Sequence, residues 1–424
     1  HSVTVYYSGT PHPAANPPWD GGWVWAKDSL DRPWMTTACQ GIGASTWYPC
    51  KDHQADEPDR GASLSITADD PLVGVANGRL RSVTPHGDRT TTYQWVVTQP
   101  INSYNLCPYI GAYVNLRETY PGEKGDLEMS YWVLDYNREK VPAHLAPQAR
   151  RMMKSFEGWF GPYPFYEDGY KLVDAPGYGM EHQSAVAYHG YRNGNRGKDH
   201  SGTGWGLQWD FLLVHESAHE WFGNSITAAD PADKWLHEGF ACYADVLFMH
   251  DYLGERAGHE YVVGTRRNIW NDEPIIGPYG VGKEGSSDMY PKARNLLHML
   301  RALIGDDAKF RNILRGMNRQ FYHRTVTTGE IEDYLSREAG LDFSQLFDQY
   351  LRTAQVPVFE YSIKEGVLAY RYANCLPGFA MPVRVTAGAD HWLTPTTAWQ
   401  QMPLPAGTDT LTVDNRFYIG VEKR

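Results

Sequence analysis

The sequence predicts a multidomain α+β fold in which β structure flanks a mostly helical centre. Short runs of alternating apolar and polar residues fill the N-terminal part of the chain, and a helical period replaces them after Pro142. Alternation returns from Val356 onward. These changes predict an N-terminal β domain at residues 1–140, a mostly helical domain at 141–353 and a small C-terminal β domain at 354–424.

The N-terminal domain is predicted to be sandwich-like because its strands are short and are separated by turn residues. Glycine, proline, asparagine and aspartate interrupt the alternating runs, as they do between the strands of a β-sandwich. The clearest runs are Leu64–Thr67, Thr92–Val97 and Leu127–Val133.

Two helices are predicted in the middle of the chain. The segment 205–221 carries apolar side chains near one helical stripe, and Gly223 follows it as a stop signal. A second helix is expected to begin with Asp230 as its N-cap and Pro231 in its first turn. This second helix carries Glu238.

Later helix starts and the C-terminal strands have their own signals. Tyr290 precedes Pro291, which favours a helix that begins at the proline and leaves Tyr290 outside the helical conformation. Thr327 and Glu330 have the spacing of a capping box. From Val358 onward, alternating apolar residues predict the strands of the last domain.

Composition excludes several classes of function. The chain has 424 residues and a formal net charge of -11, which argues against the basic face that nucleic acid requires. No run of eighteen apolar residues is present, so no membrane span is expected. The five cysteines lack CxxC spacing, which argues against a zinc ribbon. We expect a soluble monomer, and favour a periplasmic or secreted location over a cytoplasmic one.

The most informative pattern is an HExxH motif formed by His215, Glu216 and His219. Residues four apart lie on one face of a helix, so both imidazoles can bind one ion with Glu216 beside them. Glu238 follows after a gap of eighteen residues. Two histidines and a glutamate are a standard ligand set for one catalytic Zn²⁺, which keeps a fourth position for water. The alternative is an amphipathic helix with two surface histidines.

Three segments together resemble the gluzincin zinc aminopeptidases, the family of aminopeptidase N and leukotriene hydrolase. The first pairs HESAHEWFGN at residues 215–224 with WLHEGFA at 235–241, where the family usually has WLNEGFA. Gly179-Met180-Glu181-His182 resembles the GxMEN signature, and 289–293 resembles the segment of the catalytic tyrosine. The resemblance implies a thermolysin-like catalytic domain. It also implies that the first N-terminal strands are missing and that the family's large C-terminal helical domain is absent.

The resemblance assigns roles to residues of this chain. Glu216 is the expected general base, and Tyr290 the expected hydrogen-bond donor to the oxyanion. Glu181 is expected to bind the ammonium group of the substrate, next to Gly179 and Met180 in the substrate-binding segment. Tyr178 and His182 stand where the signature has glycine and asparagine, which puts the shape of the first pocket in doubt.

Two further roles are predicted. Gln40 lies in a segment that resembles the family's N-terminal loop, which reaches the same ammonium group. Asp245 lies seven residues after Glu238, on the same helical face, and is expected to accept a hydrogen bond from a metal-binding histidine.

The expected function is therefore hydrolysis of the first peptide bond of peptides with a free amino terminus. Two alternatives stay open: a thermolysin-like zinc endopeptidase, which needs no ammonium anchor, and a non-catalytic peptide-binding homologue. A lipid-epoxide hydrolase activity, known within the wider family, has no specific support in the sequence. The presence of both Glu216 and Tyr290 argues against a protein that only binds peptides.

Overall fold

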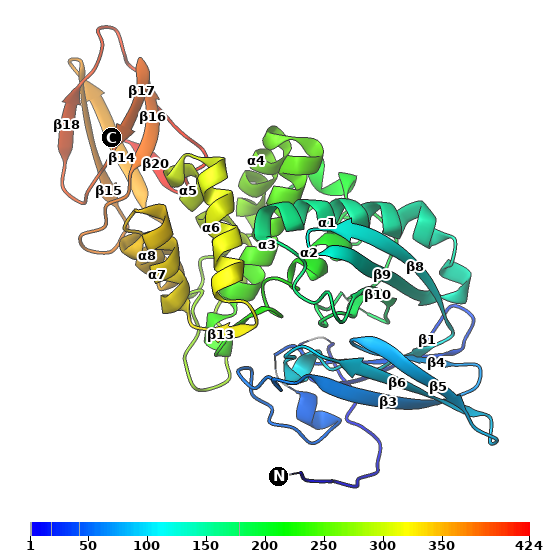
Figure 1. Cartoon of the computed structure of the whole chain (residues 1–424). Coiled ribbons are helices and arrows are strands. Elements are labelled where there is room, and N and C mark those ends of the chain that lie inside the picture. The colour runs from blue at the N-terminus through cyan, green and yellow to red at the C-terminus, as the bar shows by residue number, and fades with distance from the viewer. Residues whose placement is uncertain (1, 18, 42, 178) are drawn as a thin grey trace. The chain divides into compact units, whose positions relative to one another are not determined.

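The computed structural model describes residues 2–17, 19–41, 43–177 and 179–424, and it confirms the multidomain α+β class (Figure 1). The chain divides into two compact units. The first comprises residues 1–199, 206–231 and 318–325, and the second comprises 200–205, 232–317 and 326–424. The predicted division into three domains stays a prediction.

Two antiparallel sheets form the N-terminal part of the first unit. Their strands, in spatial order, are β1 (Gly22–Lys27), β2 (Pro33–Ala38), β7 (Tyr109–Gly111) and β4 (Val73–Val75) in one sheet, and β3 (Ala62–Asp69), β6 (Thr90–Val97) and β5 (Arg79–Pro85) in the other. Buried side chains from both sheets, including Ile66, Trp95 and Tyr109, belong to one hydrophobic core. The predicted runs at Leu64–Thr67 and Thr92–Val97 lie within β3 and β6.

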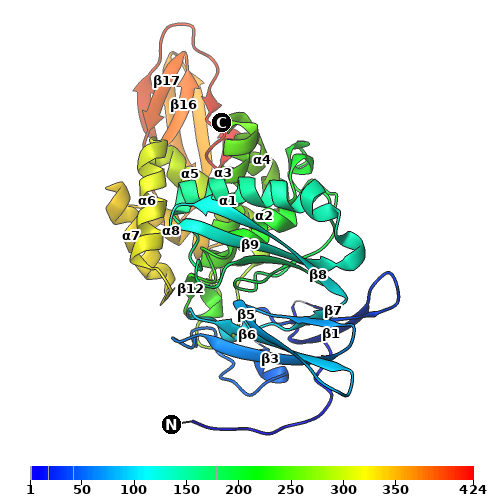
Figure 2. The same ribbon diagram turned by 45° about the vertical axis from the view of Figure 1, so that its right-hand side comes forward.

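A third sheet of the first unit carries the segment that resembles GxMEN. Its order is β11 (Val186–Tyr188), β10 (Tyr170–Asp174), β9 (Gly125–Leu134) and β8 (Tyr113–Gly122). Because β9 pairs in parallel with β10, one sheet joins residues on both sides of the boundary predicted at residue 140. The helices α1 (Ala146–Phe160) and α2 (Phe211–Ala218) cover one face of this sheet (Figures 1 and 2).

Helices make up most of residues 235–351, nearly all of which belong to the second unit. They are α3 (Trp235–Leu253), α4 (Glu255–Gly264), α5 (Pro291–Ile304), α6 (Asp307–Gln320), α7 (Thr328–Ala339) and α8 (Ser344–Leu351). The capping box predicted at Thr327 and Glu330 is confirmed at the start of α7. Within the described residues, no helix is long and apolar enough to cross a membrane.

Two predicted helix boundaries are wrong. The segment 205–221 contains a 3-10 turn at Trp205–Gln208 and then the separate helix α2. Pro231 begins a short 3-10 turn, Pro231–Asp233, and α3 begins only at Trp235. The buried Asp233 carboxylate accepts hydrogen bonds from the Thr328 backbone at 3.1 Å and hydroxyl at 2.5 Å. These tertiary contacts hold the turn in place, and local sequence signals do not record them.

Two sheets end the second unit, as the alternation predicts. The first sheet has the strand order β18 (Gln400–Pro403), β15 (Val367–Ala373), β14 (Val358–Lys364) and β20 (Gly420–Lys423). The second has the order β17 (Ala389–Leu393), β16 (Val383–Ala387) and β19 (Thr412–Val413). Within the described ranges, the remaining strands are β12 (Ile226–Ala228) and β13 (Arg324–Val326), which pair in a two-stranded sheet. Buried aromatic side chains such as Phe359 and Tyr372 fill the core of this β domain.

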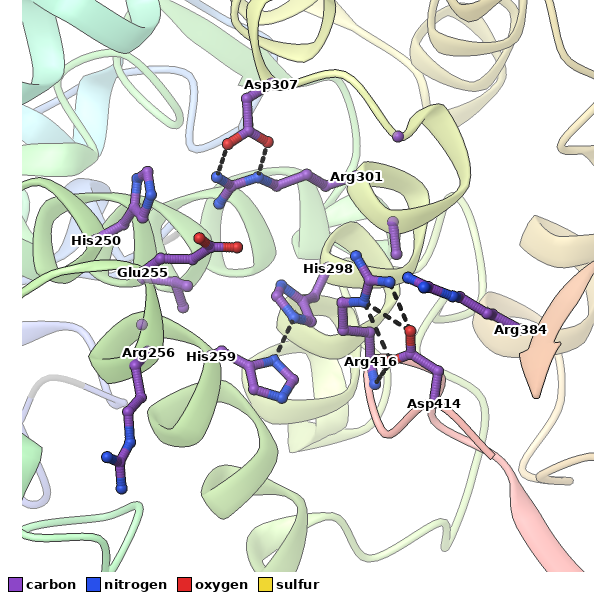
Figure 3. Close-up of a pocket in the computed structure, with 14 residues that line it drawn as sticks. His250, Glu255, Arg256, His259, His298, Arg301, Asp307, Arg384, Asp414 and Arg416 are labelled. Atoms are coloured by element: carbon purple, nitrogen blue, oxygen red, sulfur yellow. Dashed lines mark hydrogen bonds and ion pairs between the residues drawn. The ribbon is translucent and has the colours of Figure 1, made fainter. Parts of the chain in front are cut away.

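A polar cavity of about 670 Å³ lies among α3, α4, α5 and the C-terminal strands of the second unit (Figure 3). Its cations are largely neutralised within it: Arg301 pairs with Asp307, and Arg416 pairs with Asp414. His298 is buried in its wall and contacts His259 at 3.2 Å between ring nitrogens. Burial, together with His259 and nearby arginines, holds the pKa of His298 well below its usual range.

This environment of His298 predicts how the stability of the fold depends on pH. The folded protein keeps His298 neutral at pH values where the unfolded chain is already protonated, so the unfolded state binds more protons below about pH 6.5. As the pH decreases below this value, the free energy of unfolding should fall by about 1.4 kcal/mol per pH unit from this residue alone. Urea unfolding of the wild type and His298→Gln at pH 7, 6 and 5 measures the difference. Equal slopes in the two proteins would contradict the assignment.

Candidate active site

The helix α2 positions the two histidines of the HExxH motif. The Asp210 carboxylate caps its first turn by accepting a hydrogen bond from the Leu213 backbone at 3.3 Å. The same carboxylate accepts hydrogen bonds from Tyr188 Oη at 2.5 Å and His144 Nε2 at 2.7 Å. These contacts begin α2 at Phe211 and separate it from the preceding turn, which is why the continuous helix predicted over 205–221 is not formed.

Both histidines are buried and held in fixed orientations. The rings of His215 and His219 are nearly perpendicular, with centroids 5.0 Å apart, and the His215 ring stacks on Phe211 at 4.8 Å. His219 Nδ1 lies 3.0 Å from the Phe222 carbonyl oxygen. A hydrogen bond from Nδ1 to a carbonyl leaves Nε2 as the nitrogen that can bind a metal.

The donor set fits Zn²⁺. His215, His219 and Glu238 each offer a buried ligand atom, and these three atoms lie within 4.8 Å of one another. Two imidazole nitrogens and one carboxylate oxygen suit a catalytic zinc ion, with room for a fourth ligand. A second group that meets the same distance criterion combines His215 with Cys242 and Asp245. The proximity agrees with the proposed orienting role of Asp245, which stays a prediction.

Glu216 lies against the backbone of Gly179. A Cβ atom added to Gly179 would lie 2.5 Å from Glu216 Oε1 and 2.7 Å from its Cγ, closer than any side chain tolerates. Glu216 is 8% exposed. A side chain at position 179 would have to displace the buried Glu216 side chain, so glycine permits this close approach to the proposed general base. Gly179 belongs to the segment predicted to bind substrate.

The Glu181 carboxylate is buried and oriented by a tyrosine from the 3-10 turn Ser103–Asn105. Tyr104 Oη donates a hydrogen bond to Glu181 Oε1 at 3.0 Å. The backbone of Glu181 accepts a hydrogen bond from Asn224 Nδ2 at 2.8 Å, and Asn224 follows α2 closely. Met180 pairs in antiparallel fashion with Ala187 of β11. Glu181 is thus fixed on both its side chain and its backbone.

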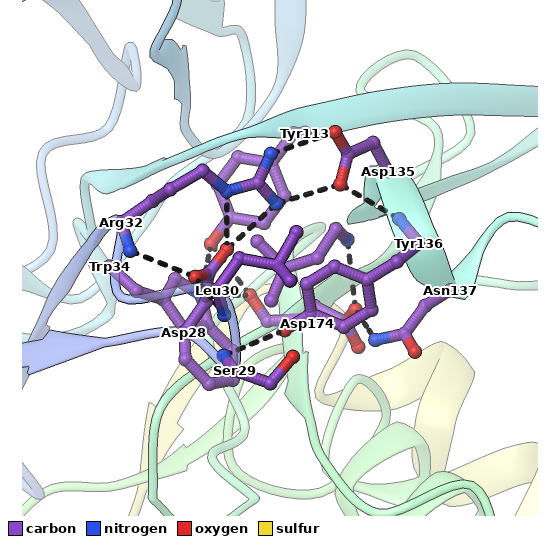
Figure 4. Close-up of polar contacts among 11 residues, drawn as sticks. Asp28, Ser29, Leu30, Arg32, Trp34, Tyr113, Asp135, Tyr136, Asn137 and Asp174 are labelled. Carbon is purple, nitrogen blue, oxygen red and sulfur yellow. Dashed lines mark hydrogen bonds and ion pairs between the residues drawn. The ribbon is translucent and has the colours of Figure 1, made fainter.

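Asp174 anchors the start of the loop that leads to Glu181 (Figure 4). Its carboxylate accepts hydrogen bonds from Leu134 N and Asn137 Nδ2, both at 2.9 Å. Tyr191 Oη donates to the same carboxylate, and Tyr113 Oη donates to the backbone carbonyl at 2.7 Å. Burial raises the pKa of Asp174 to about 6 against the effect of these hydrogen bonds. The end of β10 is therefore fixed before the loop begins.

An ionic bridge ties the first hairpin to the same region. Arg32 donates two hydrogen bonds to Asp135, at 2.7 and 2.8 Å, and one to Asp28 at 2.8 Å (Figure 4). Asp135 follows β9, whose last residue, Leu134, donates its backbone N–H to Asp174. The hairpin β1–β2, which leads to Gln40, is thereby connected to the loop that carries Glu181.

His182, which replaces the usual asparagine of the signature, has a buried polar environment of its own. Its Nδ1 lies 2.7 Å from Tyr109 Oη. The buried thiol of Cys107 belongs to the same environment. Burial raises the pKa of this thiol, but interaction with His182 and hydrogen bonds from the Thr36 and Thr37 hydroxyls bring it down to about 7. His182 is therefore part of a structural network behind Glu181. Tyr178, the other departure, lies outside the described residues.

The remaining predicted residues lie in the second unit or just after the first hairpin. Glu238 is buried in the first turn of α3, and Asp245 pairs with buried Arg294 at 3.2 Å. Tyr290 caps α5, which begins at Pro291 as predicted. Its backbone is nevertheless right-handed helical (φ -82°, ψ -71°), because the preceding residues already form a 3-10 turn. Gln40 is half-buried after β2, and its proposed contact with substrate stays a prediction.

Four residues of the site were missed or misread in the sequence. Tyr104 and Asn105 carry no local signal, because their partners lie at Glu181 and Asn224, far along the chain. Asn224 directly follows the predicted helix stop at Gly223 and has no role assigned from sequence, whereas its side chain joins the segment after α2 to the backbone of Glu181. Arg294 follows the segment that resembles the catalytic tyrosine motif and reads as an ordinary helix residue, although it pairs with a buried aspartate of α3.

Comparison with known proteins agrees with this geometry. Residues 207–350 match the peptidase family M1 domain. The chain is 21% identical to probable aminopeptidase 1 of Sulfurisphaera tokodaii, over 82% of this chain and 43% of the relative. It is 26% identical to aminopeptidase N of Canis lupus familiaris, over 71% of this chain and 32% of the relative. The chain thus spans less than half the length of these curated relatives.

A solved structure shares the fold. The M1 zinc metallopeptidase from Deinococcus radiodurans matches with a TM-score of 0.64 at 20% sequence identity, covering 82% of this chain and 75% of the other. A mutant of that protein bound to a Tyr-Ser-Ala substrate matches with a TM-score of 0.65 at 21% identity. At this identity the likeness establishes the fold.

The contact between Gly179 and Glu216 can be tested by one added methyl group. We expect Gly179→Ala to lower the free energy of unfolding by about 1–3 kcal/mol, the usual cost of overpacking a dense site. Gly158→Ala is the matched control, because Gly158 lies in α1 with open space around it. That control should be neutral or stabilising, since alanine favours helix. Urea denaturation of both variants decides, and equal stabilities would contradict the close contact.

Proposed function

We propose that this chain, whose residues 207–350 match the peptidase family M1 domain, is a zinc-dependent aminopeptidase. It would hydrolyse the first peptide bond of peptides that have a free amino terminus. The observation that carries the proposal is the buried Glu181 carboxylate, fixed in a loop whose neighbouring Gly179 touches Glu216. A general base and a candidate ammonium anchor therefore lie on adjoining segments.

The chain's own residues supply the proposed chemistry. His215, His219 and Glu238 would hold the metal; bound zinc polarises a carbonyl and brings the pKa of water to about 7. Glu216 accepts a proton from the attacking water and passes it to the leaving amine. Tyr290 would donate a hydrogen bond to the oxyanion as the tetrahedral intermediate forms.

Glu181 would determine that cleavage starts from the amino terminus. A buried carboxylate is a strong partner for an ammonium group, because the hydrogen bond is charge-assisted in a desolvated site. Tyr104 engages Oε1, which keeps the carboxylate in one orientation. The segment of Gly179 and Met180 is proposed to lie along the bound peptide, although the Met180 backbone itself pairs with Ala187. Gln40 is proposed as a second contact to the same ammonium group.

The general-base role of Glu216 predicts that activity and metal binding can be separated. Glu216→Gln should lower kcat by roughly 100- to 10,000-fold, because proton transfer is lost. The variant should keep one zinc per chain, since Glu216 is not a ligand in the proposed set. Elemental analysis and hydrolysis of aminoacyl p-nitroanilides measure the two properties. His219→Ala is the control that should lose both, and full activity in Glu216→Gln would reject the role.

The ammonium anchor is tested with free and blocked substrates. Glu181→Gln removes the negative charge. For peptides with a free amino terminus, it should weaken transition-state binding by about 1.5–3 kcal/mol, which lowers kcat/KM by roughly ten- to hundredfold. Glu139→Gln, an exposed substitution in the same unit, is the control and should leave kcat/KM unchanged. The wild type should not cleave N-acetylated peptides. Comparable rates on acetylated peptides would favour the endopeptidase alternative.

A further inference from the structure

The first unit contains a cavity of about 100 Å³ that has no part in the proposed function. It lies between β5 and β6 on one side and β8, β9 and β10 on the other, with walls that include Gly78, Trp95 and Lys171. Since each water molecule in the liquid takes about 30 Å³, the cavity has room for roughly three waters or for a group of three or four heavy atoms.

Lys171 places a buried amine in the wall of this cavity. The residue is 3% exposed, and its Nζ donates a hydrogen bond to the Gly78 carbonyl oxygen. Nζ also lies 5.4 Å from the centre of the Trp95 ring. Because Gly78 and Trp95 both line the cavity, these contacts locate the amine at its surface.

No carboxylate among the described residues forms a salt bridge with Lys171. The two carboxylates that line the cavity have other partners. Asp168 accepts hydrogen bonds from Thr98 N at 2.9 Å and Thr98 Oγ1 at 2.8 Å, and Glu128 pairs with Arg79 at 3.0 Å. A buried ammonium without a paired carboxylate is costly, so the neutral amine is favoured.

Nearby charges also affect the equilibrium between the ammonium and neutral amine forms of Lys171. Burial, aided by Arg79, lowers the pKa of Lys171 to about 7 against the opposing effect of Asp168, Glu220 and Glu128. Roughly half of the molecules would therefore carry a free amine near neutral pH. A free amine keeps the nitrogen lone pair that a nucleophile needs.

Other polar groups of the cavity have unused hydrogen-bonding capacity. Asn115 Oδ1 is buried and has no hydrogen-bond partner among the described residues. Arg117, an exposed residue at the mouth of the same cavity, forms no ion pair within the described part of the chain, and Ser130 adds a buried hydroxyl. A guanidinium and a hydroxyl can donate to a carboxylate, and the amide oxygen can accept from an N–H.

We propose that Lys171 is a site of reversible carbamylation by carbon dioxide. The lone pair of Nζ attacks the carbon of CO₂, an N–C bond forms, and one C=O electron pair moves onto oxygen. The Nζ proton leaves to water, so the product is a lysine carbamate anion with no change in oxidation state. Arg117 and Ser130 stabilise the new carboxylate by donating hydrogen bonds to it. The Asn115 amide oxygen accepts a hydrogen bond from the adjacent N–H of the carbamate.

The pH dependence distinguishes a carbamate from a small anion that binds without a covalent bond. Carbamate formation consumes the neutral amine and releases a proton, so it strengthens as pH rises through about 7. A bound anion would instead favour the ammonium form of Lys171 and take up a proton, so its affinity would increase as pH falls. The two sites would therefore respond to pH with opposite signs.

The test uses the full chain in ¹³C-bicarbonate between about pH 6.5 and 8.5, a range that spans the titration of the amine, followed by trapping with triethyloxonium and peptide mass mapping. We expect an ethoxycarbonyl group on the Lys171 peptide, with an occupancy that rises with pH. It should be absent in Lys171→Met and several-fold lower in Arg117→Gln. The wild-type result needs no substitution, and Lys27, which is exposed and paired with Asp31, is the internal control.

Three outcomes would overturn the proposal. The first is an unmodified Lys171 in a sample whose α-amino group is trapped. The second is equal occupancy at Lys171 and Lys27, which would mean that the cavity contributes nothing. The third is bicarbonate binding that strengthens as pH falls without a modified peptide, which would identify a non-covalent anion site.

Discussion

The side chain of Asn224 is the contact on which the arrangement of the site depends. It follows the HExxH helix and donates a hydrogen bond to the backbone of Glu181 at 2.8 Å, while its own oxygen accepts from Asn105 Nδ2 at 2.8 Å. All three residues are buried. In a desolvated setting, an unsatisfied amide costs more than a made bond contributes. A single amide therefore joins the end of the helix, the loop that carries Glu181 and the 3-10 turn Ser103–Asn105.

These hydrogen bonds of Asn224 explain why the residues around Glu181 have little conformational freedom. With the loop fixed to the end of α2, the backbone of Gly179 lies against the Glu216 carboxylate and has no space for a side chain. Tyr104, in the 3-10 turn Ser103–Asn105, then reaches Glu181. The Asp174 network fixes the other end of the loop. Positioning thus comes from hydrogen bonds at both ends of a short segment, with a glycine between them.

The sequence predicts those parts of the molecule that have a local signature. The fold class follows from the change between alternation and helical period, and the start of α5 follows from Pro291. The break before α2 could not be predicted, because it depends on hydrogen bonds that the Asp210 carboxylate accepts from Tyr188 and His144, which lie in other elements. Tyr104 and Asn105 were missed for the same reason: their partners are far away in sequence, and long-range pairing leaves no periodic trace.

The pairing of Met180 with Ala187 gives the loop that carries Glu181 a role in solubility, besides its proposed role in binding substrate. Strand β11 lies at the edge of its sheet, and an edge strand with open N–H and C=O groups is a template for pairing with another molecule. The loop occupies this edge through the two hydrogen bonds between Met180 and Ala187. Substitutions that release the loop would therefore uncover a sheet edge and promote aggregation, in addition to any effect on peptide binding.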